Sequence, residues 1–211
     1  MKAYIIKIGI THSDPIIWRR VIMPAGATFN RLHDVMQNIT NFQSSSYEDY
    51  HLYKFDLSEE NIRVTNDEEA SLNNLSIVVK KPKGLKIDHY LEKYGVINYT
   101  YDFGDNWELD IKLEGIVDDY YFGYPTLLEG AETAPPEDIG GLPSYYEFLE
   151  IYHDDKHPNY EEIKAWSKEQ GFQEYDPDHI NAMLKFIQYK KTEWDKINHQ
   201  NYRIIDDKYR K

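Results

Sequence analysis

The sequence predicts an α+β fold with a mostly antiparallel, curved sheet, one helix packed in the N-terminal half and a C-terminal helical segment. Strand-like alternation dominates residues 1–118, and helical spacing dominates from residue 144 onward. A stretch rich in proline and glycine separates the two. We therefore expect a single domain over residues 1–190. Its parts are a sheet-rich part (1–118), a Pro/Gly-rich strap (119–143) and a helical part (144–197), followed by a charged tail (198–211).

The first elements are two strands and a helix. Residues 4–10 and 16–23 have strand patterns, and the Asp-Pro pair between them favours a turn. Thr28 is the expected N-cap of a helix that reaches Ile39 and whose apolar residues recur at helical spacing. This spacing puts His33 on the exposed side of the helix.

The next segment contains shorter elements. Residues 41–50 are predicted to be a polar loop, and residues 51–55 a strand with His51, Tyr53 and Phe55 on one face. Residues 58–74 are expected to form a loop with at most a short helix. A short β-branched run and a helix that ends at Gly95 come next.

The stretch YTYDFGDNWELDIKLEGI, residues 99–116, has the clearest pattern. Two runs with a period of two flank a Gly-Asp-Asn turn, which predicts a hairpin with one buried face. The expected buried residues are Tyr99, Tyr101 and Phe103 on the first strand and Trp107, Leu109, Ile111 and Leu113 on the second. Thr100 and Asp102 are then expected on the opposite face, with Glu108 and Asp110.

Three helices are predicted after the strap. Ser144 and Glu147 have the spacing of a capping box, and Pro158 is the expected start of a second helix. Asp176-Pro177 begins a third, whose apolar side runs as far as Trp194. The tail beyond residue 198 is expected to fray.

The composition limits the classes of function. The chain has 24 Lys and Arg against 37 Asp and Glu, a formal charge of −13, which opposes general nucleic-acid binding. The absence of cysteine excludes disulfides, thiolate zinc sites and cysteine nucleophiles. No segment has the roughly 20 apolar residues that span a bilayer, and no signal peptide is recognised, so we expect a cytoplasmic protein.

Motifs of common enzyme classes are absent. The sequence has no phosphate-binding GxxxxGK or GxGxxG, no GxSxG elbow and no HExxH, and its histidines lack the spacing of a helical zinc site. We therefore expect no cofactor and assign no catalytic residue. The sequence leaves the oligomeric state open.

Four acidic residues form the main candidate cluster. Asp102 and Asp105 belong to the hairpin turn, and Glu137 and Asp138 belong to the segment PPEDIGG. Such residues commonly bond their own backbone in turns, and this is the interpretation we favour. The alternative is a site for a hard divalent cation such as Mg²⁺ or Ca²⁺, which prefers several carboxylate oxygens.

One basic run is the candidate nucleic-acid contact. It consists of Lys80, Lys81, Lys83 and Lys86, and we interpret it first as a solvated loop. The alternative is a phosphate contact shared with Arg19 or Arg20. These two arginines face opposite sides of a strand and therefore cannot converge, which excludes the arginine-lined site of a serine recombinase.

Three blocks of the sequence resemble the plasmid pRiA4b ORF-3-like family. They are DPIIWRRVIMPAGATFNRLHDVMQ, YTYDFGDNWELDIKLE, and APPEDIGGLPSYYEFLE followed by HPNYEE. The resemblance implies an α+β fold with a curved sheet and an association with plasmids and mobile elements. It implies little about activity, although some members carry the label of a transposon resolvase.

The chain departs from the family pattern at two places. Many members have His where this chain has Leu109, and often Cys where it has Ala134. If those groups bind a metal in relatives, two ligands are missing here, so we assign no metal site. The extended, proline-rich PPEDIGG segment suits a crossing of the sheet. We therefore expect the hairpin turn and residues 137–141 to lie close together, with Asp side chains accepting backbone N–H bonds.

The leading functional hypothesis is a non-enzymatic interaction or accessory module with a protein partner. One alternative is a divalent-metal-dependent hydrolase or nuclease that uses the hairpin and PPED carboxylates. Another is a nucleic-acid-associated protein or a phosphate-mimicking inhibitor. The candidate cluster, functional or structural, is Trp18, Arg19, His51, Asp102, Asp105, Trp107, Glu137 and Asp138.

Overall fold

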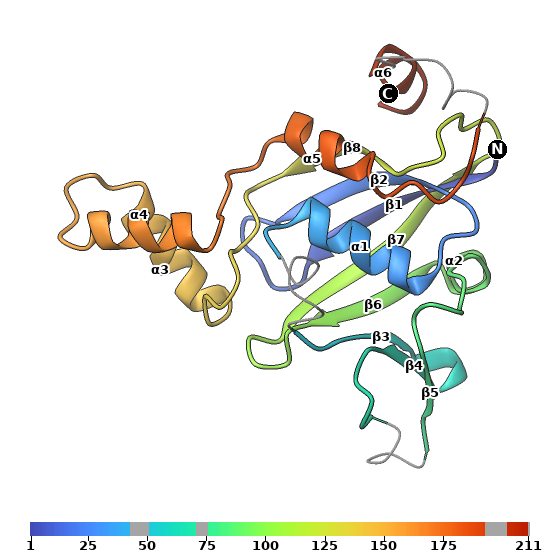
Figure 1. The fold of residues 1–211 in the computed structure, drawn as a ribbon, viewed down its shortest axis with the longest axis horizontal. Coiled ribbons are helices and arrows are strands. Elements are labelled where there is room, and N and C mark those ends of the chain that lie inside the picture. The colour runs from blue at the N-terminus through green and yellow to red at the C-terminus, as the bar shows by residue number, and fades with distance from the viewer. Residues whose placement is uncertain (43–50, 71–75, 193–201, 211) are drawn as a thin grey trace.

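The computed structural model describes residues 1–42, 51–70, 76–192 and 202–210 (Figure 1). Its strands form one sheet in the order β5-β4-β3-β6-β7-β1-β2-β8. They are β1 (Ala3–Ile10), β2 (Trp18–Pro24), β3 (Tyr53–Leu57), β4 (Ile62–Thr65), β5 (Val78–Lys80), β6 (Val96–Tyr101), β7 (Trp107–Val117) and β8 (Thr126–Ala131). Among the strands that the structure describes, β4 and β5 are the one parallel pair. The expected α+β class with a mostly antiparallel sheet is confirmed.

The helices lie mainly on one side of this sheet and at its edge. They are α1 (Phe29–Ile39), α2 (Asp88–Tyr94), α3 (Leu142–Tyr152), α4 (Tyr160–Glu169), α5 (Pro177–Leu184) and α6 (Tyr202–Tyr209), with a 3₁₀ turn, η2 (Ser58–Glu60). Figure 1 shows α1 across the sheet, and α3 and α4 as an arm that projects beyond the ends of the strands. No helix in the described part of the chain combines the length and the apolarity needed to cross a membrane.

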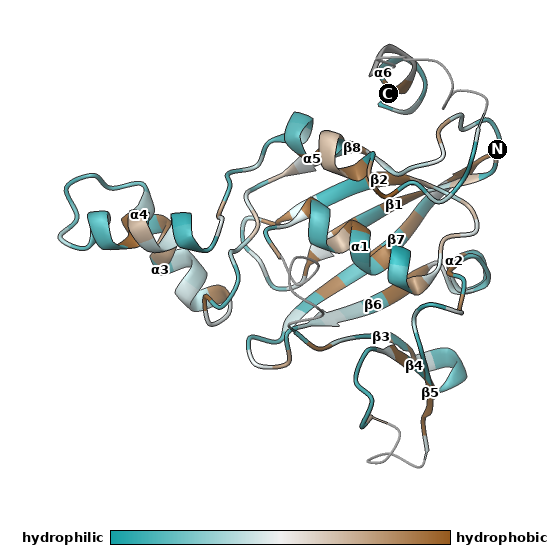
Figure 2. Cartoon of the chain, viewed as in Figure 1, coloured by the Kyte–Doolittle hydropathy of each residue, from teal (hydrophilic) through white to brown (hydrophobic). Residues whose placement is uncertain are grey.

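The main core lies between α1 and the sheet. Successive side chains of a strand point to opposite faces, and Tyr4, Ile6 and Ile8 of β1 are buried on the face that α1 covers. On α1 the spacing of Leu32, Val35 and Met36 gives a matching apolar stripe. Figure 2 shows hydrophobic residues recurring along the strands, whereas the loops around them are hydrophilic.

A second, smaller core lies on the opposite face, at the β1–β2–β8 side. Ala3, Ile22 and Leu128 pack there with Ile205 and Tyr209 of α6. The expectation that the tail frays is therefore wrong for residues 202–209. Two buried apolar side chains stabilise this short helix through tertiary packing, which supplies most of the stability of helices in proteins.

The expectation that His33 is exposed is also wrong, because the residue is only 3% exposed. His33 Nδ1 and the Tyr99 hydroxyl lie 2.8 Å apart, and the imidazole stacks on Tyr53 with centroids 3.7 Å apart. Burial lowers the His33 pKa to about 3. The buried face of α1 is wider than a stripe of apolar residues alone would indicate.

Two strands lie where none was predicted. Ile62 and Val64 alternate into the core as part of β4, within the region predicted to be a loop. Residues 126–131 of the strap form β8, which pairs with β2. The sequence pattern did not indicate this strand, because its apolar run is short and its surroundings are rich in proline and glycine. Strand β3 begins at Tyr53, so His51 precedes it.

The predicted ends of the helices are correct in part. Arg31 N donates to Thr28 Oγ1 at 3.3 Å, and Gly95 closes α2 in the left-handed conformation, as expected. Asp176 caps α5, but this helix ends at Leu184, and Trp194 lies outside the described residues, as do most of 41–50.

The expected capping box at the start of the next helix is wrong. Gly141 is the N-cap of α3, and Ser144 lies inside the helix, where its hydroxyl donates to Gly140 O at 3.4 Å. The second predicted helix, α4, begins two residues after Pro158, at Tyr160.

Candidate functional site

The turn of the β6–β7 hairpin is fixed by Asp102. This residue is in the left-handed region, with φ 51°, and its backbone N–H donates to Leu52 O at 3.0 Å. Its carboxylate accepts a 2.9 Å bond from Gly104 N, as expected for an Asp in a turn. The expectation that Asp102 points to an open face is wrong. Only 8% of the residue is exposed, because the chain leaves the strand geometry after Tyr101.

The strap crosses this hairpin turn. Residues that follow β8 run beside the C-terminal end of α1, where Asn41 Nδ2 donates to Ala134 O at 2.7 Å and Asn41 pairs with Pro136. Further along, Gly140 N donates to Asp105 Oδ2 at 2.8 Å. The expected approach of the two segments, with Asp side chains accepting backbone N–H bonds, is confirmed.

His51 lies between the turn and the strap. Its Nδ1 is 3.5 Å from Asp102 Oδ1, and its Nε2 is 3.5 Å from both Glu137 Oε2 and Asp138 Oδ1. These four residues are called the His51 cluster below. They come from three separate segments: the chain before β3, the hairpin turn and the strap.

The His51 cluster is strongly acidic and half enclosed. Asp102 and Glu137 are each 8% exposed, whereas the Asp138 side chain is 52% exposed. Among the described residues, neither Lys nor Arg lies within ion-pair distance of Asp102. One imidazole therefore faces three carboxylates, and the Tyr101 hydroxyl donates to Glu137 Oε1 at 2.6 Å. Two of the three carboxylates are thus largely buried, which is costly unless hydrogen bonds or positive charge offset it.

Three members of the cluster have the spacing of metal ligands. His51, Asp102 and Asp138 each offer one atom, and these atoms lie within 4.8 Å of one another. Ligand bonds of about 2.0–2.2 Å place neighbouring donor atoms roughly 3–4 Å apart, so these side chains would close in slightly around a bound ion. Asp105, expected in the carboxylate set, binds the strap amide instead. The exposed Asp138 leaves one side of the group open to solvent.

The other predicted site residues contribute to the framework. Trp107 is 2% exposed and packs near Phe42, with ring centroids 6.0 Å apart. Trp18 is half-buried, with Lys7 Nζ 4.4 Å from its ring centroid. Neither indole offers a binding surface at the His51 cluster.

Arg19 is a buried cation with a structural role. It is 3% exposed, and it donates to the carbonyls of Ile39 (3.0 Å), Ala131 (2.7 Å) and Glu132 (2.8 Å), and also to that of Trp18. Burial lowers its pKa to about 10. The expected opposite orientation of Arg19 and Arg20 is confirmed, since Arg20 pairs with Glu114 and Glu129 on the other face. Arg19 therefore cannot join a phosphate contact.

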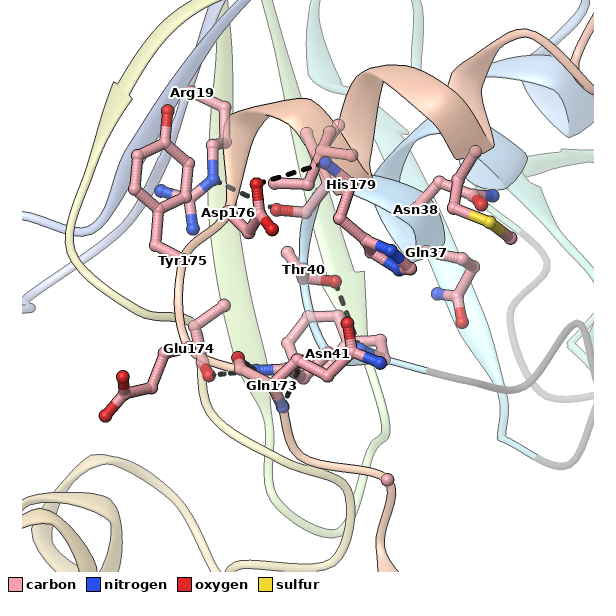
Figure 3. A pocket seen from close by; sticks show the side chains of 16 residues that line it. Arg19, Gln37, Asn38, Thr40, Asn41, Gln173, Glu174, Tyr175, Asp176 and His179 are labelled. Atoms are coloured by element: carbon pink, nitrogen blue, oxygen red, sulfur yellow. Dashed lines mark hydrogen bonds between the residues drawn. The ribbon is translucent and has the colours of Figure 1, made fainter. Parts of the chain in front are cut away.

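A pocket of about 200 Å³ lies over Arg19 and was not predicted (Figure 3). The end of α1, residues 171–176 and α5 line it. Asn41 bonds both the N–H and the C=O of Gln173, and Asp176 Oδ1 accepts the N–H of His179 at 3.1 Å. The Asp176 bond is a local helix cap, but the Asn41–Gln173 bonds join segments far apart in the chain, so no local sequence pattern indicates the pocket.

Comparisons with known proteins agree with this fold. The chain is 32% identical over 193 residues to "Uncharacterized protein y4hQ" of Sinorhizobium fredii, covering 89% of this chain and 88% of the relative. It also matches the crystal structure of protein of unknown function MM3350 from Methanosarcina mazei Go1. This match has a TM-score of 0.65 and 31% identity, and it covers 84% of this chain and 96% of that one. The model of the plasmid pRiA4b ORF-3-like protein family matches residues 2–183. The chain therefore belongs to the plasmid pRiA4b ORF-3-like family.

Proposed function

We propose that the protein binds a divalent cation at the His51 cluster. The observation that carries this proposal is the convergence of ligand atoms from His51, Asp102 and Asp138, within 4.8 Å of one another, from three separate segments. The burial of Asp102 and Glu137 beside one imidazole supports it, because a divalent ion would offset part of the negative charge that these two carboxylates bring into the fold.

The donor set narrows the choice of ion. Imidazole suits Zn²⁺ and other transition metals, whereas carboxylates suit Mg²⁺, Ca²⁺ and Mn²⁺. A site with one imidazole and two carboxylates therefore favours Mn²⁺ or Zn²⁺ over Ca²⁺, which takes six to eight oxygen ligands. Glu137 Oε2 lies beside His51 Nε2, the nitrogen that also faces Asp138. It would therefore add a further oxygen close to a bound ion.

The cation would have two consequences for function. It would fasten the strap to the hairpin, and the exposed side at Asp138 would leave coordination positions for water or a ligand. A metal-dependent hydrolase would use those positions, and this is the alternative that the site favours. The net charge of −13 opposes a nucleic-acid substrate.

An accessory role with a protein partner, a link to mobile elements and a cytoplasmic location stay predictions.

Calorimetry on metal-free protein tests the proposal. After treatment with EDTA and its removal, titration with Mn²⁺ or Zn²⁺ is expected to show one ion per chain, with submillimolar affinity. Asp138→Asn should weaken binding at least tenfold. Asn tolerates the left-handed conformation that Asp138 adopts, with φ 55°, and the side chain is largely exposed, so the fold should be retained. Asp155→Asn, an exposed residue with the same change of charge, is the matched control.

Two results would overturn the proposal. One is the absence of binding by Mn²⁺, Zn²⁺, Mg²⁺ and Ca²⁺ in the millimolar range. The other is binding that persists unchanged in both Asp138→Asn and His51→Ala, since the ion would then lie elsewhere.

A further inference from the structure

The basic run is held against the first turn of α1. Phe29 N donates to Leu85 O at 3.0 Å, Asn30 N donates to Pro82 O at 3.2 Å, and Ile87 N donates to Ala27 O at 3.0 Å. These bonds fix the backbone on both sides of Lys83. The N–H groups of Phe29 and Asn30, which an isolated helix would leave without partners, are therefore already bonded to the chain. A ligand at this end of α1 would have to be held by side chains.

A second segment closes the same region from the other side. The backbone N–H groups of Tyr189 and Lys190 both donate to Gly123 O at 3.1 Å, and the Tyr189 hydroxyl donates to Pro24 O at 2.6 Å. The Lys190 ammonium lies against Gly26, where an added Cβ would be 2.7 Å from Nζ. The position of this ammonium therefore depends on a residue that has no side chain.

A cavity of about 410 Å³ lies between the two segments and is called the basic hollow below. Its lining is Gly26, Thr28, Asn30, Arg31, Lys83, Tyr189 and Lys190. Three of these side chains are cationic and none is a carboxylate. Arg31 pairs with Asp34 at 3.0 Å, whereas Lys83 and Lys190 form no ion pair within the described ranges of the chain. The Asp88 carboxylate accepts the Gly26 N–H at 2.8 Å, so three cations stand against two nearby carboxylates, a weakly positive balance in a protein with a net charge of −13.

An adjoining cavity of about 350 Å³ shares Asn30 and Lys83 with the basic hollow. Lys80 and Lys81 line it, but so do Asp67 and Glu68, and Lys81 Nζ lies 3.0 Å from Glu68 Oε1. A polynucleotide that followed the basic run would meet these two carboxylates. The distribution of charge thus suits a ligand with one compact anionic group in the basic hollow. The rest of that ligand, toward the adjoining cavity, would be neutral or polar.

We propose that the basic hollow binds the phosphate group of a small ligand. Arg31, Lys83 and Lys190 would supply the charge, and the Asn30 amide and Thr28 hydroxyl line the same cavity. Free phosphate and a phosphate monoester share this chemistry, and the cavity is large enough for either. This site is independent of the cation proposed for the His51 cluster, because the two lie toward opposite ends of α1.

The test is a calorimetric titration of the full chain at low salt with EDTA present, so that no metal contributes. The probes are inorganic phosphate, pyrophosphate, glycerol phosphate and a single-stranded oligonucleotide without terminal phosphates. We expect at least one small phosphate to bind, with an affinity that falls as salt is added. Glycerol phosphate binding more tightly than inorganic phosphate would identify a monoester as the ligand, and the reverse would identify the free ion.

Matched lysine variants localise the binding. Lys83→Met and Lys190→Met keep most of the aliphatic stem, and each is expected to weaken binding at least fivefold without changing the unfolding temperature appreciably. Lys156→Met, at an exposed position on the α3–α4 arm, should bind as the wild type does. The proposal is overturned if no small phosphate binds at 10 mM (roughly the weakest affinity worth assigning) or if both variants bind normally. Binding of the oligonucleotide alone would also overturn it, in favour of a nucleic-acid surface.

Discussion

The two ends of α1 carry opposite charge. Near its N-terminal end the basic hollow gathers three cations, and beyond its C-terminal end the strap brings two carboxylates to His51 and Asp102. The 11 residues of the helix span only about 16 Å. Isolated helices favour the reverse arrangement, with anions at the N-terminus and cations at the C-terminus. Tertiary contacts therefore hold these charges in an arrangement that the helix dipole does not favour.

The largest expected effect concerns Arg19, which holds the C-terminal end of α1. Arg19→Met removes the donor to four carbonyls, including Ile39 O at the end of α1, and should lower the free energy of unfolding by roughly 3–5 kcal/mol. Arg20→Met, next in sequence but on the exposed face, should cost less than about 1 kcal/mol. Urea unfolding measures both, and equal losses would contradict the structural role of Arg19.

A smaller effect is expected within the acidic end itself. Tyr101→Phe removes the hydroxyl that donates to Glu137 Oε1 and should cost about 2 kcal/mol, because a bond to a buried carboxylate is lost. The comparison is Tyr146→Phe, which removes an exposed bond from Asp14 N and should cost about 0.5 kcal/mol. Denaturant titration of both variants provides the measurement. A Tyr101→Phe variant as stable as the wild type would show that Glu137 needs no donor there.

The last comparison concerns the middle of α1, where His33 is buried and the effect is spread over several pH units. Its pKa is about 3 in the folded protein and 6.5 ordinarily, so between these values the unfolded chain binds a proton that the folded chain does not. Lowering the pH through this window should therefore reduce the free energy of unfolding, by up to about 1.4 kcal/mol per pH unit. His33→Asn should flatten this slope between pH 6.5 and 4. Urea unfolding at several pH values measures the free energy of unfolding and hence the slope. Parallel slopes for the two proteins would show that His33 does not titrate in this way.

Local patterns predicted much of the fold. The hairpin follows from two runs with a period of two, and the cap of α1 follows from Thr28, because each signal involves residues close in sequence. The approach of the strap to the hairpin turn was also predictable from an extended, proline-rich segment and a turn that offers acceptors.

The remaining features depend on partners distant in sequence. His33 of α1 is buried because Tyr53 of β3 and Tyr99 of β6 pack against it. Helix α6 is stable because Ile205 packs into the second core. His51 was predicted as a site residue, but its position between three carboxylates was not. Lys190 was not predicted at all, since nothing near it in sequence indicates that Gly26 and Gly123 lie beside it.

The bonds of Arg19 have a consequence for how the native protein opens. One guanidinium joins the end of α1, the end of β8 and Tyr175, whose ring lies 4.1 Å from it. If any one of these segments detached alone, a charged group would keep its place in the interior with fewer acceptors. Amide protons in all three should therefore exchange with solvent at a common rate under native conditions, as one cooperative unit that includes the walls of the pocket above Arg19.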